Sequence, residues 1–275
     1  MTILNSVLVL GVLGAAFGAA LAVAAWVFRV DTDPRVAAVR DCLVGANCGG
    51  CGYPGCDGYA AAVARGEAAA NKCVVGGSEC AARIAKIMGV ADSEVERVVA
   101  FVPCSGSADA AEPSFRYSGP EDCRAAMLFG GKSNKLCTFA CIGLGNCVRA
   151  CKFDAMHVVN GVAQVDRLNC VGCGACVDAC PKSIVKLIPE SQRVMPACHS
   201  TDKGAQLMKA CRAGCIGCMK CQRECPAGAI TVVDNLARVD VEKCSGCGHC
   251  AEVCPRHVIV PLRPVPEKET DGAAH

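Results

Sequence analysis

The stretch "CSGCGHCAEVCP", residues 244–255, decides the fold of the second half of the chain. Its cysteines follow the spacing C-x2-C-x2-C-x3-C, and proline comes directly after the last one. The same spacing occurs in "CVGCGACVDACP" at 170–181 and in "CIGCMKCQRECP" at 215–226. A run of this kind holds three thiolates on one tight loop and directs the fourth toward a neighbouring site. It predicts [4Fe–4S] clusters of the bacterial ferredoxin type.

The cysteine content of the whole chain leaves three kinds of site to consider: disulfides, zinc and iron–sulfur clusters. Cysteine accounts for 26 of the 275 residues, and only 4% of the residues are aromatic. Zinc sites are usually built from two short cysteine pairs separated by a spacer, whereas these runs place four cysteines together before a proline. The runs therefore favour iron–sulfur clusters over zinc.

An internal repeat doubles the cysteine pattern. The segments 147–185 and 221–259 align without a gap at an offset of 74 residues, with their cysteines in register. In the second copy the ferredoxin rule assigns two complete ligand sets. These sets are Cys215, Cys218, Cys221 and Cys254 for one cluster, and Cys244, Cys247, Cys250 and Cys225 for the other.

The first copy departs from this rule at one ligand position. Leu144 stands where the second copy has Cys218, and Lys152 replaces the usual proline. The upstream segment "CTFACIGLGNCVRAC" offers Cys137, which we expect to supply the missing ligand. The predicted sets are then Cys137, Cys141, Cys147 and Cys180 for one cluster, and Cys170, Cys173, Cys176 and Cys151 for the other.

Alternating apolar segments between the cysteine runs predict short β-hairpins. "AMHVVNGVAQVD" has Asn-Gly as its turn, and "AITVVDNLARVD" has Asp-Asn at the same place. Short helices such as "VDAC" and "AEVC" follow the runs. The predicted fold class is α+β, built from small iron–sulfur domains with two tandem ferredoxin-like units.

A different cysteine motif, "GANCGGCGYPGC", lies at 45–56. Cys48, Cys51 and Cys56 need a fourth ligand, and Cys73 in "NKCVVGG" is the best candidate. The Ala-rich segment between them should be helical, which would let the chain fold back and bring Cys73 to the loop. Because this spacing differs from the ferredoxin run, it predicts a separate four-cysteine [4Fe–4S] domain.

The first 29 residues predict a single transmembrane anchor. The segment from Ile3 to Phe28 carries no charged residue. Its length of 26 residues exceeds the roughly 20 residues that a spanning helix needs. Trp26 fits an interfacial anchor, and Arg29, Arg35 and Arg40 follow the apolar run. The positive-inside rule then puts the rest of the chain in the cytoplasm, where disulfides are rare. A signal peptide is the alternative, but no Lys or Arg precedes the apolar run.

The order of these segments resembles the B subunit of the Rnf complex along nearly the whole chain. The resemblance rests on the anchor, "CGGCGYPGC", "DCRAAMLFGGKSNKLC", "CIGLGNCVRAC" and the ferredoxin repeats. It implies a membrane complex that moves electrons between reduced ferredoxin and NAD, coupled to transport of Na+ or H+. It also implies other Rnf-type membrane subunits and soluble ferredoxin as partners. Rival interpretations are an iron–sulfur subunit of another membrane oxidoreductase, a corrinoid-type methyl-transfer protein and a zinc scaffold.

Six cysteines remain outside the five predicted clusters. Cys104 and Cys123 flank one linker, while Cys198 and Cys211 flank another, so these four are a hypothetical ligand set for a sixth cluster. Four buried or free thiols are the equally weighted alternative. We interpret Cys42 and Cys80 as core residues, and His199 and His249 as packing or surface residues.

Composition and motifs also set limits on other functions. The net charge is +2 with no basic run, so no nucleic-acid surface is expected. The chain has no phosphate-binding glycine loop and no paired carboxylates, so we expect neither NAD nor flavin to bind, and no catalytic side chain. The predicted parts are the anchor 1–29, four-Cys domain 30–103, linker 104–135, cassette 1 at 136–190, linker 191–210, cassette 2 at 211–262, and a disordered tail 263–275.

Overall fold

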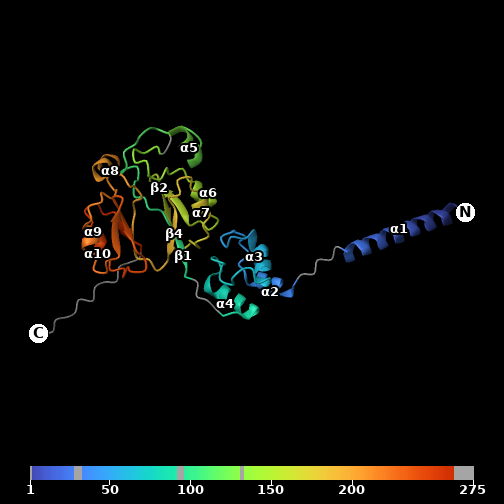
Figure 1. Cartoon of the computed structure of the whole chain (residues 1–275). Helices are drawn as coiled ribbons and strands as arrows, with labels where there is room; N and C mark the ends of the chain where they lie inside the picture. Colours follow the sequence, from blue (N-terminus) through green and yellow to red (C-terminus); the bar gives the residue numbers. More distant parts are fainter. Residues whose placement is uncertain (1, 28–32, 92–95, 131–132, 263–275) are drawn as a thin grey trace.

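The computed structural model describes residues 2–27, 33–91, 96–130 and 133–262. Along the chain it has an apolar helix, a small helical domain with four cysteines around one loop, and two ferredoxin-like units (Figure 1). Cassette 1 lies between the four-Cys domain and cassette 2 (Figure 1). This confirms the predicted fold class. The predicted disordered tail, 263–275, lies outside the described residues.

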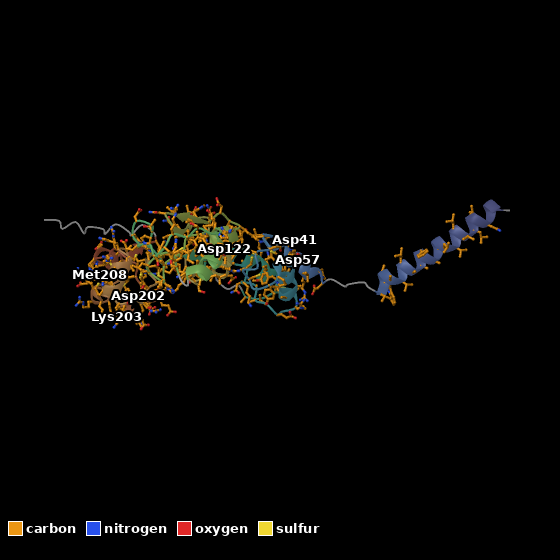
Figure 2. All side chains as sticks on the ribbon, turned by 90° about the horizontal axis from the view of Figure 1, so that it is seen from above. Asp41, Asp57, Asp122, Asp202, Lys203 and Met208 are labelled. Atoms are coloured by element: carbon orange, nitrogen blue, oxygen red, sulfur yellow. The ribbon has the colours of Figure 1, made fainter. Side chains whose placement is uncertain are left out.

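Helix α1 (Thr2–Val27) is long and apolar enough to cross a membrane, by length and composition. Its segment Val7–Val27 has a mean hydropathy of 2.5, and none of it is buried against other parts of the protein. Figure 2 shows its side chains projecting outward from the helix. A helix that is apolar all round and unburied needs an apolar solvent, so α1 fits a membrane anchor.

The four-Cys domain packs three helices around a small core. Its elements are α2 (Pro34–Cys42), α3 (Gly55–Ala64) and α4 (Gly77–Met88). Val39, Tyr59 and Ile84 contribute one buried side chain from each helix. The Ala-rich segment is helical only as far as Ala64, and after it the chain turns back toward Cys73. The phenol of Tyr59 donates a 2.8 Å hydrogen bond to the carbonyl of Ala69, which fixes that return.

Cassette 1 contains two antiparallel strand pairs and three short helices. Strand β1 (Val98–Phe101) pairs with β4 (Lys186–Pro189), and β2 (Met156–Val159) pairs with β3 (Val162–Val165). The helices are α5 (Cys123–Gly130), α6 (Asn146–Ala150) and α7 (Ala175–Ala179). Val99, Met156 and Ile184 are fully buried where the two strand pairs meet.

Cassette 2 repeats this plan. Strand β5 (Val194–Pro196) pairs with β8 (Ile259–Pro261), and β6 (Ile230–Val233) pairs with β7 (Leu236–Val239). The helices are α8 (Gly204–Ala210), α9 (Lys220–Arg223) and α10 (His249–Glu252). In each cassette the outer pair joins a strand from before the cysteine runs to a strand that follows them, which closes the unit.

The two inner hairpins turn where the sequence predicts. Asn160 and Gly161 have φ of 47° and 74°, and Asp234 and Asn235 have φ of 51° and 61°. Positive φ at both central residues is the conformation of a type I′ turn, which suits the twist of a two-residue hairpin. Each turn packs on the glycine of a cysteine run: Gly143 touches Gly161, and Gly217 touches Asn235. These are equivalent contacts at the 74-residue offset.

Two strands extend the cassettes beyond the ranges expected from the sequence. β1 lies inside the expected four-Cys domain, 30–103, yet it pairs with cassette 1. β5 lies in the expected linker, 191–210, yet it pairs with cassette 2. The alternation of apolar and polar residues in a strand of three or four residues does not reveal which strand it pairs with. The partners of β1 and β5 are β4 and β8, which come much later in the sequence.

The contact at Gly143 predicts a large effect of one methyl group on stability. A Cβ there would lie 2.3 Å from the carbonyl oxygen of Gly161, at a φ of +82°. Gly66 is the control, because it has a φ of +76° and open space around it. Gly66→Ala should cost only the left-handed strain of about 1–2 kcal/mol. Gly143→Ala should lower the melting temperature, followed by circular dichroism, clearly more; equal shifts would contradict the packing described.

Candidate iron–sulfur sites

All 26 cysteines carry free thiols, and 24 of them fall into six groups of four. Five groups line separate cavities with empty volumes of about 290–400 Å³. We number the groups along their spatial order. Site 1 is Cys48, Cys51, Cys56 and Cys73; site 2 is Cys151, Cys170, Cys173 and Cys176; site 3 is Cys123, Cys141, Cys147 and Cys180; site 4 is Cys104, Cys137, Cys198 and Cys211; site 5 is Cys215, Cys218, Cys221 and Cys254; site 6 is Cys225, Cys244, Cys247 and Cys250.

Site 1 joins the glycine-rich loop to Cys73, as the sequence suggests. The side chain of Asn47 accepts a 2.8 Å hydrogen bond from the backbone N–H of Cys56, which fixes the loop. Cys80 lies next to Cys73 but outside the cavity lining, and its sulfur is 3.1 Å from the carbonyl oxygen of Cys42. A hydrogen bond from the Cys80 thiol lowers the pKa of Cys73 to about 6. Cys80 thus supports a ligand, and it is buried with Cys42 in the core.

Sites 2, 5 and 6 bring together the cysteines that the ferredoxin rule groups. In sites 2 and 5 the four sulfurs line one cavity each. In site 6, Cys250 is flanked by Cys244, Cys247 and Cys225. Cys218 and Cys247 are the exposed members of sites 5 and 6.

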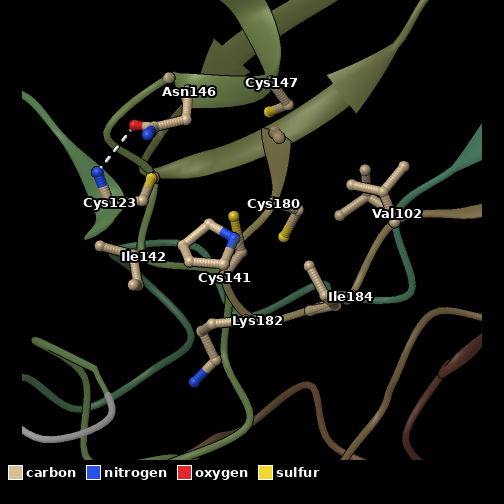
Figure 3. A pocket seen from close by; sticks show the side chains of 14 residues that line it. Val102, Cys123, Cys141, Ile142, Asn146, Cys147, Cys180, Lys182 and Ile184 are labelled. Atoms are coloured by element: carbon tan, nitrogen blue, oxygen red, sulfur yellow. Dashed lines mark hydrogen bonds between the residues drawn. The ribbon is translucent and has the colours of Figure 1, made fainter. Parts of the chain in front are cut away.

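Site 3 differs from its expected composition, because Cys123 occupies the place assigned to Cys137. The sulfurs of Cys123, Cys141, Cys147 and Cys180 face one another across the cavity (Figure 3). Cys123 begins α5, and its N–H donates a 2.7 Å hydrogen bond to Asn146, the first residue of α6 (Figure 3). Leu144, which replaces the expected second cysteine of the run, packs in the apolar group around Cys123.

Cys137 is found in site 4 instead, with Cys104, Cys198 and Cys211. The N–H of Leu136 donates a 2.7 Å hydrogen bond to the carbonyl of Glu112, which turns this segment toward the linker and away from α6. The hypothetical sixth set therefore contains Cys137 in place of Cys123. The 74-residue offset of the repeat could have predicted this grouping, since Cys137 corresponds to Cys211: Cys137 stands four residues before Cys141, and Cys211 stands four residues before Cys215.

The contacts of His199 and His249 are those of a packing residue and a surface residue, respectively. The His199 ring packs edge-on against Phe139, with 6.2 Å between ring centroids, and it lines the site 4 cavity beside four cysteines. Burial lowers its pKa. His249 lies 3.3 Å from the carboxylate of Glu252 on the surface of α10.

The donor sets and the spaces between them fit [4Fe–4S] clusters. Thiolates are soft ligands suited to iron–sulfur clusters, and each cavity is lined mainly by apolar atoms. Within the described part of the chain, no three His, Cys, Asp or Glu side chains converge closely enough to hold one metal ion. The sulfurs instead stand around a cavity, which is the arrangement required when each thiolate binds a different iron.

Burial raises the pKa of several of these thiols. The pKa of Cys147 rises to about 12, and those of Cys176, Cys221 and Cys250 rise to about 11. The thiols are therefore protonated before a cluster enters, and binding must release these protons.

Backbone N–H groups point at many of the sulfurs. Ala100 donates to Cys170 at 3.3 Å, Ala155 donates to Cys151 at 3.4 Å, and Val258 donates to Cys254 at 3.4 Å. Hydrogen bonds of this kind stabilise negative charge on a cluster and raise its reduction potential. The backbone thus contributes to each site beyond the ligands themselves.

Site 1 and site 2 are in direct contact. A Cβ on Gly50, between Cys48 and Cys51, would lie 2.8 Å from the carbonyl oxygen of Cys173 and 3.0 Å from its Cα. Only glycine allows the two cysteine loops to approach so closely. The glycine-rich opening stretch therefore serves the contact with cassette 1 as well as its own site.

Comparison with known proteins identifies the family. The chain is 46% identical to the B subunit of the Na+-translocating ferredoxin:NAD+ oxidoreductase complex of Acetobacterium woodii, over 93% of this chain and 78% of the relative. It is 42% identical to the B subunit of the ion-translocating oxidoreductase complex of Methanosarcina acetivorans, over 94% of this chain and 97% of the relative. The chain belongs to the family of Rnf complex B subunits.

Further matches agree with this family. The B subunit of the proton-translocating ferredoxin:NAD+ oxidoreductase complex of Clostridium ljungdahlii is 42% identical over 94% of this chain and 92% of the relative. A family model described as "Putative Fe-S cluster" matches residues 43–75. Models of a 4Fe-4S dicluster domain match residues 140–185, 169–230 and 207–255. Cys104, Cys123 and Cys137 lie outside all four matched ranges.

The arrangement around Cys73 predicts different effects for two adjacent cysteines. Cys73→Ala should lose the four irons of site 1, while Cys80→Ala should keep them. Cys80→Ala should also make the potential of that cluster more negative, because a hydrogen bond to the sulfur of Cys73 is lost. Iron analysis and a redox titration followed by electron paramagnetic resonance (EPR) measure both effects. Cys42→Ala is the control, and loss of iron in Cys80→Ala would overturn the assignment.

Proposed function

We propose that this chain carries electrons into an Rnf-type complex. Reduced ferredoxin would donate the electrons, and other membrane subunits would reduce NAD and translocate Na+ or H+. The names of the 46% and 42% identical relatives support this role, since they describe B subunits of ferredoxin:NAD+ oxidoreductase complexes. The observation that carries the proposal is a series of adjoining four-cysteine sites running from exposed cysteines to the four-Cys domain.

The cysteines of sites 1, 2, 3, 5 and 6 would hold five [4Fe–4S] clusters. Such a cluster accepts or gives up one electron at a time. The chain itself would position the clusters, keep water out of the cavities and direct backbone N–H groups at the sulfurs. No side chain needs to act as an acid, a base or a nucleophile, and binding of NAD and flavin would be left to other subunits.

The two ends of the series suggest entry and exit. Cys218 and Cys247 in cassette 2 are exposed, so a soluble donor could approach sites 5 and 6 closely. Site 1 lies in the domain that follows α1, which would hold it near the membrane subunits. We propose a single pass through the cell inner membrane with the bulk of the chain in the cytoplasm, because arginines follow the apolar helix.

An iron–sulfur subunit of another membrane oxidoreductase, such as a hydrogenase, is the second candidate. It would share the anchor and the ferredoxin units. The four-Cys domain favours the Rnf role, because the relatives from ferredoxin:NAD+ oxidoreductase complexes align with this chain through that domain, whereas a simple ferredoxin subunit needs only the cassettes.

The composition of the sites predicts the metal content. Protein purified without oxygen should contain at least about 20 iron and 20 acid-labile sulfide per chain, the content of five [4Fe–4S] clusters. Cys218→Ala, which removes a ligand of site 5, should lower the iron by about four relative to wild type. Stoichiometric zinc with little iron would contradict the proposed function altogether.

The proposed direction predicts where a block occurs. In the complete complex, replacing Cys48 and Cys51 by alanine should leave reduction of the cassettes by ferredoxin intact and abolish transfer to the other subunits. Rapid-freeze EPR measures the first effect, and ferredoxin-dependent NAD reduction measures the second. Cys42→Ala is the matched control, because its thiol is buried in the same domain outside the site. If reduction by ferredoxin fails instead, the direction is reversed.

A further inference from the structure

Two linkers that the domain division left without a role come together as a structured layer. Ala111 and Cys211 form an antiparallel bridge, in which Glu112 donates to Ala210 at 3.0 Å and Arg212 donates to Ala110 at 2.7 Å. Ser105 also donates to Ala197 at 3.0 Å. These bonds bring residues 104–112 beside residues 197–212. Cys104 and Cys198 from the two linkers, together with Cys137 and Cys211 from the beginnings of the two cassettes, then surround one cavity of about 290 Å³.

The backbone around this cavity is arranged as it is around the ferredoxin-type sites. The N–H of Cys141 donates to the sulfur of Cys104 at 3.4 Å. The N–H groups of Phe139 and Ala213 point at the sulfurs of Cys137 and Cys211, and those of Cys215 and Ser200 point at Cys198. All four sulfurs therefore have a backbone donor. Neutral buried thiols do not require such donors, whereas thiolates that share the charge of a cluster are stabilised by them.

A buried lysine provides an independent observation. Lys135 is only 7% exposed, and it is the one charged side chain among the buried residues that the structure describes. Its ammonium donates to the carbonyls of Gly106 and Gly161, both at 2.7 Å. The thiols that face it are Cys104, Cys141, Cys211 and Cys137, three of which belong to site 4. A buried cation needs compensating negative charge, which a thiolate-bound [4Fe–4S] cluster supplies.

Site 4 lies between the two cassettes. On one side the hydrogen bond from Cys141 to Cys104 joins it to site 3. On the other side the bond from Cys215 to Cys198 joins it to site 5. Arg256, in the lining of site 5, donates a 3.0 Å hydrogen bond to the carbonyl of Cys211. The junction with site 3 therefore has one backbone hydrogen bond and two neighbouring cations, Lys135 and Lys182, which both face Cys104, Cys137 and Cys141. The junction with site 5 has Arg256 as its neighbouring cation.

We infer that Cys104, Cys137, Cys198 and Cys211 hold a sixth [4Fe–4S] cluster, and that this cluster connects the two cassettes electrically. The inference rests on the proposed electron-transfer function and adds a site to it. One electron arriving from site 5 would reduce the site 4 cluster and leave the site 5 cluster oxidised. The same exchange with site 3 would return site 4 to its oxidised state, so no further reactant is required.

The first test is the metal content of the full-length chain. Wild-type protein, reconstituted without oxygen, should contain about 24 iron and 24 sulfide, the content of six [4Fe–4S] clusters. Cys198→Ala and Cys211→Ala should each lose about four of both. Cys42→Ala, a buried cysteine outside the six sites, should keep the wild-type content.

Two results would overturn the sixth cluster. One is a wild-type content that stays at about 20, and the other is a Cys211→Ala variant with undiminished iron. Both results would leave five clusters and the proposed function intact. Zinc in place of iron would instead overturn the proposed function itself. Because the wild-type count needs no variant, the test holds even if a substitution prevents folding.

The second test asks whether site 4 connects the cassettes. After mixing with a limiting amount of reduced ferredoxin, Cys211→Ala should hold its electrons in sites 5 and 6, while sites 1 to 3 stay oxidised. Rapid-freeze EPR of the full chain distinguishes this from wild type, where electrons should reach all sites. If the electrons are distributed over sites 1 to 3, 5 and 6 in the same way in wild type and in Cys211→Ala, site 4 does not connect the cassettes.

The buried lysine gives a third readout. Lys135→Met should make the potential of at least one cluster more negative, because a facing cation favours the reduced, more anionic form. Lys209→Met is the matched control, since Lys209 occupies the equivalent position of the repeat but is exposed. EPR-monitored redox titration should therefore shift in the first variant and not in the second. Identical titrations would contradict a cluster beside Lys135.

Discussion

The structure depends on thiols from separate segments meeting around one cavity. Each of the six sites takes at least one cysteine from outside the loop or helix that supplies the others. Sites 2 and 5 show this plainly, because Cys151 and Cys254 each reach the loop of another run. A bound cluster would therefore act as a cross-link. With 4% aromatic residues and strands of three or four residues, the cassettes have little apolar core with which to hold these segments otherwise.

The sequence alone predicted the parts of the fold that depend on local spacing. The C-x2-C-x2-C-x3-C runs gave the grouping seen in sites 2, 5 and 6, and the Asn-Gly and Asp-Asn turns gave both hairpins. It did not predict the pairing of β1 with β4 or of β5 with β8, because these strands are short and their partners lie about 65–90 residues further along the chain. When the pairing partner is unknown, such a short segment cannot be distinguished from irregular chain by its sequence.

The exchange of Cys123 and Cys137 has the same physical origin. Proximity in sequence favoured Cys137, which stands four residues from Cys141. In the structure the decisive contacts are longer in range: Asn146 holds Cys123 beside the start of α6, and the carbonyl of Glu112 draws the segment before Cys137 into the linker layer. A ligand that replaces a missing cysteine need not be the nearest one along the chain. The 74-residue symmetry was the better guide, because it treats Cys137 and Cys211 alike.

The cations at the junctions of site 4 give the linker layer an electrostatic character of its own. Lys135 and Lys182 lie on the side of site 3, and Arg256 lies on the side of site 5. Adjacent clusters that both carry negative charge repel an added electron, and the repulsion grows as they approach each other in a medium of low dielectric. A cation beside each junction reduces this repulsion. The linkers therefore do more than join two copies of a cassette: they supply Cys104 and Cys198 of the intervening site, and they supply Lys135, whose charge offsets this repulsion. This explains why Lys135 is buried although Lys209, its counterpart in the repeat, is not.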